Sequence, residues 1–418
     1  MSSRGTSSWK GHITSLPKHI SLGNVSGGVV AWLFGVTGPL LIVLQAAENG
    51  NLSFAETTSW VFSIYVVGGL LTILLSIYYR QPIAVAFSIP GAVLVSTTML
   101  HHSFSDVIGA YVVTGLLVLV LGLTKVVDKI MNILPMPVMM GMVSGVLLPF
   151  GVNIFTAITD NPFINGTIFF AFLALSFFQL FVKWFPPILG VIVVAFALFF
   201  IFDLGDFSGI QFGIAQPGIF LPSFNMATMG ELVIPLALTV IAIQNAQGIG
   251  VLKSMKYDPP VNAMTNWSGI GSLVNSVFGA HSACIAGPMT AILADDNTGP
   301  KEGRYAGAVI MGILWVLFGL FAPVSTSLTN AVPASFINLL GGLALIGVLQ
   351  NCLQMTFSGS FKIGALFSFL ITISGVTVLG VGAPFWGLVG GTLVSFLLEP
   401  KDYANFIKRQ SNKKTEAA

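Results

Sequence analysis

Long apolar runs separated by short polar breaks occupy most of this chain and constrain its fold more than any other feature. A run of about 20 apolar residues is long enough to cross the hydrocarbon core of a bilayer as a helix. Only 8% of the 418 residues are charged and 55% are hydrophobic, whereas soluble domains carry about 25% charge. A chain of this kind cannot build a polar surface, so we expect an all-α polytopic membrane protein.

The polar breaks divide the sequence into fourteen predicted spans. They lie near residues 28–46, 58–78, 83–100, 107–124, 135–150, 164–182, 187–203, 231–251, 261–279, 281–294, 305–323, 334–355, 362–380 and 384–399. Lysine and arginine, which mark cytoplasmic loops, fall only in the two tails and in the loops that follow even-numbered spans, as Lys125 and Lys253 do. We therefore expect a multi-pass protein of the inner or plasma membrane with both termini cytoplasmic.

Four short matches relate the first half of the chain to the second. Residues 45–48 match 244–247, residues 89–94 match 285–290, Pro135 matches Pro333, and residues 187–190 match 384–387, at separations of 196 to 199 residues. Near-constant separations in chain order indicate an internal repeat. Because seven spans is an odd number, the second copy must be inverted, as in many transporters.

The repeat divides the chain into two seven-span units. Residues 25–203 form the first unit and residues 231–400 the second, joined by an external linker at 204–230. Cytoplasmic tails are expected at residues 1–24 and 401–418.

Spans 3 and 10 are interrupted at equivalent places, by Pro90 and Gly91 in one and by Gly287 and Pro288 in the other. Proline removes a backbone donor and glycine tolerates non-helical dihedrals, so each segment is predicted to be extended backbone followed by a half-helix. Such backbone survives at membrane depth only where protein or a water-lined cavity satisfies it. The N-terminus of a half-helix attracts anions. The paired positions favour a substrate site over two packing kinks.

Residues of spans 1 and 8 and of the interrupted spans 3 and 10 supply the candidate substrate site. The candidates are Gln45, Ser88, Ile89, Gly91, Gln244, Asn245, Gln247, His281, Ser282 and Gly287. Polar groups inside a membrane are expensive and mark function by default, although hydrogen bonding between helices remains the alternative. For a coupling proton the candidates are His281 and Glu48; His281 can instead be a neutral structural donor, and Glu48 can simply be solvated.

Four motifs carry a family resemblance. They are Tyr79-Arg80-Gln81-Pro82-Ile83, the segment Phe87-Ser88-Ile89-Pro90-Gly91-Ala92, the segment Gln244-Asn245-Ala246-Gln247-Gly248-Ile249, and Phe278-Gly279-Ala280-His281. In this order the chain resembles the benzoate/proton symporter (BenE) family from about residue 25 to 400. Two positions depart from the usual pattern, since Ile89 and Cys284 stand where typical members have threonine and asparagine.

The resemblance implies the inverted seven-plus-seven fold of nucleobase and sulfate carriers. Spans 1–4 and 8–11 would form a core domain and spans 5–7 and 12–14 a gate domain, with substrate between spans 3 and 10 beside spans 1 and 8. The function expected is proton-coupled uptake of benzoate or a related small aromatic carboxylate by alternating access. The alternatives are an uncoupled anion channel and a nucleobase or inorganic-anion carrier of the same fold.

The expected partners are the substrate, a proton and the lipid bilayer, and a homodimer is left open. Nucleic acid is not expected, because the basic residues form no continuous face. Cys284 and Cys352 both lie in apolar stretches and suggest neither a disulfide framework nor a metal site. We expect no cofactor, and no clustered histidines and carboxylates of the kind that a membrane enzyme requires.

Overall fold

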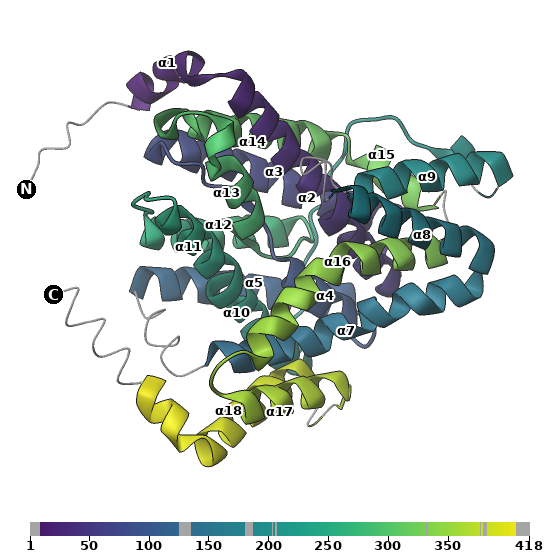
Figure 1. Ribbon diagram of the computed structural model, residues 1–418, viewed down its shortest axis with the longest axis vertical. Coiled ribbons are helices and arrows are strands. Elements are labelled where there is room, and N and C mark those ends of the chain that lie inside the picture. The colour runs from purple at the N-terminus through teal and green to yellow at the C-terminus, as the bar shows by residue number, and fades with distance from the viewer. Residues whose placement is uncertain are drawn as a thin grey trace, which may run out of the picture.

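The computed structural model describes residues 9–124, 135–179, 187–202, 204, 207–330, 333–376, 378 and 383–406. This part of the chain is mostly helical, with one small two-stranded sheet (Figure 1). The ends of both predicted tails and the loops at 125–134 and 180–186, with Lys125, lie outside the described residues.

The helices and strands follow the order of the predicted spans. The first half contains α1 (Trp9–His19), α2 (Leu22–Asn49), α3 (Phe54–Tyr79), β1 (Val85–Phe87), α4 (Ile89–Thr98), α5 (Phe104–Thr124), α7 (Met136–Asp160), α8 (Pro162–Gln179) and α9 (Pro187–Phe202). The second half contains η1 (Phe207–Gly209), α10 (Met226–Leu238), η2 (Thr239–Asn245), α11 (Ala246–Ser254), α12 (Val261–Val277), β2 (Ala283–Ile285), α13 (Gly287–Ala294), η3 (Asp296–Thr298), η4 (Lys301–Gly303), α14 (Tyr305–Leu320), α15 (Ala322–Asn330), α16 (Ala334–Phe357), α17 (Lys362–Ile373) and α18 (Ala383–Leu398).

Within the described ranges, six helical stretches are long and apolar enough to cross a membrane alone. They are Leu22–Asn49, Phe54–Tyr79, Phe104–Thr124, Met136–Asp160, Met226–Lys253 and Lys301–Leu320. The pair Ser335–Leu343 and Leu345–Phe357, bent by 46°, gives a seventh if counted as one span. Five further apolar helices are shorter, α4 and α17 among them. The chain is therefore a polytopic helical membrane protein, and the predicted fourteen spans exceed what helix length and composition identify.

β1 and β2 pair in antiparallel fashion, with Ala86 opposite Cys284. Each strand leads into a short helix, β1 into α4 and β2 into α13, and both strands are fully buried. The edges of this small sheet are satisfied by side chains. Thr72 Oγ1 accepts from the Val85 N–H at 2.9 Å, and Asn245 Oδ1 accepts from the Ile285 N–H at 2.7 Å. Extended backbone can persist here because neighbouring helices supply its missing hydrogen bonds.

The helices form two sets, one of which surrounds this sheet. In the first, which we call the sheet bundle (α2–α5 and α10–α14 with both strands), α3 packs on α14 and α5 packs on α12. In the second, the peripheral bundle (α7–α9 and α16–α18), α7 packs on α16 and α17, and α17 packs on α18. Figure 1 shows α17 and α18 at the opposite end of the molecule from α3 and α14. The two bundles meet along α4 with α7, α2 with α16 and α10 with α18.

Candidate functional site

A cavity of about 260 Å³ lies where the two strand-to-helix junctions face the peripheral bundle. We call it the central cavity. Its lining comes from α2, the residues around Pro90 and Pro288, η2 with α11, and the facing parts of α7 and α16. Most of the wall is apolar, and its polar side chains are Gln244, Gln247 and Asn351. The apolar lining includes Phe34, Phe87, Ile89, Met136, Met140, Ile243, Met289, Val348 and Met355.

Gln244 and Gln247 reach the cavity from an unusual helical segment. Residues Thr239–Asn245 form a π-helix between α10 and α11, a rare feature that is frequent at functional sites. Gln244 is 7% exposed and Gln247 is exposed. Among the described residues neither side chain has a hydrogen-bond partner, although the cavity wall holds both. Each carboxamide can therefore donate to a bound oxygen.

The N-terminus of α13 opens beside Gln247. Its N-cap residue, Ala286, provides no side-chain hydrogen bond, so the first N–H groups of the helix keep their partial positive charge. A Cβ on Gly287 would lie 2.5 Å from Cγ of Gln247. Only glycine at this position leaves Gln247 in place. The predicted residues Gln247 and Gly287 thus form one local arrangement at the head of α13.

The equivalent end of α4 is capped. Ser88 Oγ accepts from the Gly91 N–H at 3.0 Å and donates to Thr239 Oγ1 at 2.9 Å. The hydroxyl of Ser88 therefore joins α4 to the π-helix, and it is not part of the cavity wall. A Cβ on Gly91 would lie 2.6 Å from Leu236, so Gly91 permits the close approach of α10. Of this trio of predicted residues, Ile89 alone lines the cavity.

Asn245 holds the sheet and does not line the cavity. Besides accepting from Ile285, it donates from Nδ2 to Ser268 Oγ at 3.1 Å. Ser282 is 2% exposed, and its hydroxyl has no partner among the described residues. Cys284, one of the two departures from the family pattern, is buried in β2 against Val118 and Val240.

His281 is fully buried between α3 and the α4 junction. Nδ1 accepts from the indole N–H of Trp60 at 3.0 Å, and Nε2 donates to the Ser88 carbonyl at 3.1 Å. Because an indole nitrogen only donates, Nδ1 must be unprotonated in this arrangement. Both ring nitrogens are used in holding neighbouring segments together. The geometry favours a neutral structural donor over a proton carrier.

Gln45 and Glu48 lie away from the central cavity. Gln45 Nε2 donates to Asn338 Oδ1 at 2.7 Å, a contact that joins α2 of the sheet bundle to α16 of the peripheral bundle. Glu48 is exposed near the end of α2. Of the ten predicted site residues, Ile89, Gln244 and Gln247 line the central cavity, and Gln45 does not.

Several lining residues were not predicted. Met136 and Met140 lie one turn apart on α7, and Asn351 and Met355 lie one turn apart on α16. Asn351 had a usable signal, because a polar side chain within an apolar span is a functional candidate. The methionines had none, since methionine is common in apolar helices and its role here depends on which face meets the sheet bundle.

No charged side chain lines the central cavity within the described part of the chain. In the same part, no three His, Cys, Asp or Glu residues are placed to hold a metal ion, and both Cys284 and Cys352 are free thiols. The cavity can hold a small solute with an apolar body through its rings and methionines. It can bind one polar end through two carboxamides and the α13 terminus.

The fold is similar to that of anion transporters of known structure. The transmembrane domain of the cyanobacterial bicarbonate transporter BicA matches with a TM-score of 0.62 at 16% identity, covering 88% of this chain and 97% of that domain. SLC26A9 matches with a TM-score of 0.60 at 17% identity, covering 92% of this chain and 67% of that protein. At such low identity these likenesses show the fold alone.

Sequence comparison is more specific. Inner membrane protein YdcO of Escherichia coli (strain K12) is 31% identical over 369 residues, 87% of this chain and 93% of that protein. The benzoate membrane transport protein of Acinetobacter baylyi is 28% identical over 394 residues, 93% of this chain and 98% of that protein. The family of benzoate membrane transport proteins matches residues 18–397. The chain therefore belongs to this family, BenE, and is a membrane transporter rather than an enzyme.

Proposed function

We propose that this chain is a secondary transporter that binds benzoate or a related single-ring carboxylate in the central cavity. The observation that carries the proposal is a neutral, largely apolar cavity whose polar side chains are the carboxamides of Gln244, Gln247 and Asn351. The ring would pack against Phe34, Phe87 and the methionines. The carboxylate would receive hydrogen bonds from Gln244 and Gln247 and the partial positive charge of α13.

An inverted repeat of fourteen spans is part of this proposal, and two observations support it. Packing of α3 on α14 is the repeat equivalent of packing of α12 on α5, and both contacts occur. In addition, a two-fold axis through the central pair of β1 and β2 makes Ala86 equivalent to Cys284, 198 residues later. This separation lies within the 196 to 199 residues that relate the sequence motifs.

We assign the sheet bundle as the core domain and the peripheral bundle as the gate domain. The first repeat, 25–203, and the second, 231–400, contribute to both, with 204–230 as the external linker. A second cavity, of about 210 Å³, lies between the bundles at the far end of α4. We call it the outer cavity. Pro90 and Leu94 pack against α7 between the two cavities, which is the arrangement that alternating access requires.

The direction of opening follows from the charge pattern. Lysine and arginine mark the cytoplasmic side, which places the start of α7 and the end of α16 there. Both line the central cavity, which supports assigning this conformation as inward-facing. Uptake coupled to a proton remains part of the proposal, with His281 and Glu48 as the candidates from sequence. His281 makes both of its hydrogen bonds as a neutral imidazole, which makes it the weaker of these two candidates.

The test is uptake of radiolabelled benzoate into proteoliposomes. Uptake should rise when an inward proton gradient is imposed, and other single-ring carboxylates should compete, whereas uracil and sulfate should not. Accumulation should fail in Gln247→Leu but persist in Gln354→Leu, because Gln354 is exposed on α16 and does not line the cavity. Single-channel currents without accumulation would establish an uncoupled channel instead, and competition by uracil or sulfate would establish the alternative substrates.

A further inference from the structure

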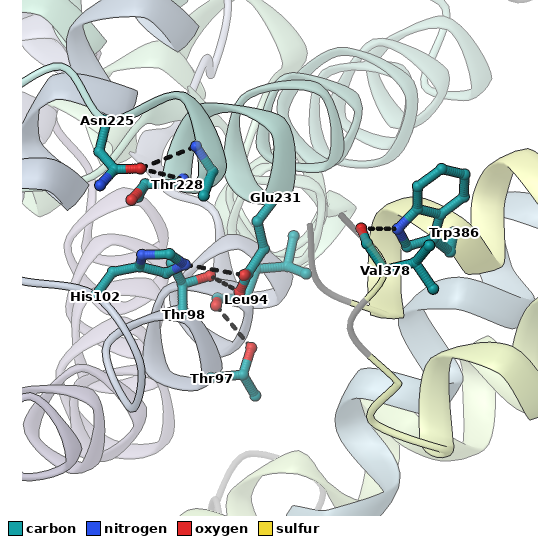
Figure 2. Close-up of polar contacts among 10 residues, drawn as sticks. Leu94, Thr97, Thr98, His102, Asn225, Thr228, Glu231, Val378 and Trp386 are labelled. Atoms are coloured by element: carbon teal, nitrogen blue, oxygen red, sulfur yellow. Dashed lines mark hydrogen bonds and ion pairs between the residues drawn. The ribbon is translucent and has the colours of Figure 1, made fainter. Parts of the chain in front are cut away.

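Glu231 is the one buried carboxylate in the part of the chain that the structure describes. It lies in the first half of α10 and is 7% exposed. Thr98 Oγ1 at the end of α4 donates to Glu231 Oε1 at 2.8 Å, and His102 Nε2 lies 3.2 Å from Oε2. Figure 2 shows these two contacts converging on the carboxylate. A buried charge in a transporter is costly and is a functional candidate by default.

This carboxylate lines the outer cavity. Glu231, Thr97 and His101 lie on the sheet-bundle side, and Gly145 and Thr372 lie on the peripheral-bundle side. The described lining contains no lysine or arginine. Whenever Glu231 is ionised, an anion that enters from outside meets its negative charge in a confined space that no lysine or arginine lines. Like charges in such a space repel strongly, because the local dielectric constant is lower than that of water.

The groups that face Glu231 can share a proton with it. His102 pairs with it directly, and His101 lines the same cavity. Asp106, in the first turn of α5, interacts electrostatically with His102. Tyr111 of α5 is buried, and α18, which also packs on α10, contributes no titratable side chain. His102 therefore interacts with two carboxylates, Glu231 directly and Asp106 electrostatically.

We infer that Glu231 and His102 form an external proton-binding site that controls admission of the anionic substrate to the outer cavity. This inference rests on the proposed function and names a group that regulates it. A proton from external water binds a Glu231 carboxylate oxygen, and no covalent bond other than the new O–H changes. The carboxyl group then carries no charge, and the anion can pass Glu231 toward the Pro90 contact. Proton binding and anion admission thereby depend on each other.

The carboxylate acts at a distance from the central cavity. Thr98 lies eight residues after Pro90 on the same short helix, which corresponds to about 12 Å at 1.5 Å per residue. Glu231 therefore controls access and does not contact the bound solute at Gln244. Changes at Glu231 should alter the KM for external substrate and leave binding in the inward-facing cavity unchanged.

The experiment is benzoate counterflow in proteoliposomes at equal pH on both faces, from about pH 6 to 8, where the substrate remains ionised. With no proton gradient, the KM of the wild type should rise with pH, approaching about tenfold per unit if one proton is required. Glu231→Gln retains an acceptor for Thr98 and removes the charge, so its KM should become independent of pH. Glu56→Gln is the matched control, since Glu56 is a partly exposed carboxylate at the start of α3 that lines neither cavity, and should keep the wild-type slope.

Two further variants keep the test decisive if Glu231→Gln is poorly folded. Glu231→Asp keeps the charge and should keep the slope. His102→Ala removes the side chain whose Nε2 lies 3.2 Å from Glu231 Oε2, so the pH dependence of the KM should change. An unchanged slope in Glu231→Gln, or a pH profile of His102→Ala identical to that of the wild type, overturns the inference while leaving the proposed function intact. If the wild type transports no single-ring carboxylate at any pH, the proposed function fails, and the inference with it.

Discussion

Replacing Gln244 with leucine should separate substrate binding from folding. Gln244 is 7% exposed, and its carboxamide has no partner among the described residues. Leucine has a similar size and no polar atoms. Removal of a buried polar group that lacks a partner leaves no neighbour unsatisfied, so the free energy of unfolding should stay the same or rise by up to about 1 kcal/mol.

Binding should respond in the opposite direction. A hydrogen bond to a charged group contributes about 1.5–3 kcal/mol, and its loss leaves part of the carboxylate unpaired. At about 1.4 kcal/mol per tenfold change, the Kd for benzoate should increase about 10- to 150-fold in Gln244→Leu. The measurement is calorimetric titration of purified protein, combined with thermal unfolding without ligand.

The neighbouring residue provides the contrast. Asn245 Oδ1 accepts from the buried Ile285 N–H at 2.7 Å, so Asn245→Leu leaves that donor unsatisfied and should cost about 1–3 kcal/mol of stability. The reasoning is refuted if Gln244→Leu binds benzoate with the wild-type Kd. It is also refuted if Gln244→Leu loses as much stability as Asn245→Leu.

Three further changes test other parts of the molecule. Gln45→Ala removes the 2.7 Å hydrogen bond to Asn338 that joins the two bundles, a contact worth about 0.5–1.5 kcal/mol. Labelling of a cysteine introduced in the outer cavity should therefore increase. Unchanged labelling would show that this hydrogen bond does not hold the bundles together at the outer cavity. Met140→Trp should fill part of the 260 Å³ cavity and abolish benzoate binding without lowering the unfolding temperature, whereas retained binding would place the site elsewhere. Burial raises the pKa of Tyr257, in the loop before α12, to about 12 from 10.0. The stability that this group contributes is therefore complete below about pH 10 and is lost as pH rises through about 12. Between about pH 10 and pH 12 the unfolding temperature of the wild type should fall faster with pH than that of Tyr257→Phe. Unfolding temperatures that fall in parallel for the two proteins would contradict the burial assigned to Tyr257.

The sequence was sufficient for features that depend on local chemistry. Apolar runs identified a polytopic membrane protein, and the proline and glycine pairs near residues 90 and 288 marked where extended backbone gives way to a short helix. Gln244 and Gln247, three residues apart in an apolar helix, line the central cavity as the pattern suggested. The family resemblance was confirmed by the match to residues 18–397.

Features that depend on distant partners were beyond reach. Trp60 and His281 are 221 residues apart, so nothing in the sequence showed that the imidazole has both nitrogens occupied. Ser88 was predicted to bind substrate because its hydroxyl is next to the predicted half-helix. In the structure this hydroxyl instead donates a hydrogen bond to Thr239 Oγ1, 151 residues away in the sequence. The π-helix was also unpredictable, since no residue pattern in Thr239–Asn245 marks the wider turn, and its contact with β2 joins segments about 40 residues apart.

In the proposed alternating-access cycle, the apolar contact between α4 and α7 separates the two cavities, and a small movement of α7 would be enough to change which cavity is open. Pro90 lines both the contact and the central cavity, and Val146 of α7 lines both the contact and the outer cavity. Leu94 and Thr97 follow Pro90 at intervals of one helical turn on α4. A shift of α7 by one turn, about 5.4 Å, would bring its apolar face from Pro90 toward Thr97, opening one cavity as it narrows the other. Since the contact is apolar, the shift breaks no hydrogen bond within it. A crosslink between introduced cysteines at Leu94 and Val146 should therefore stop transport and leave benzoate binding in the central cavity intact, and transport that continued after complete crosslinking would exclude this movement.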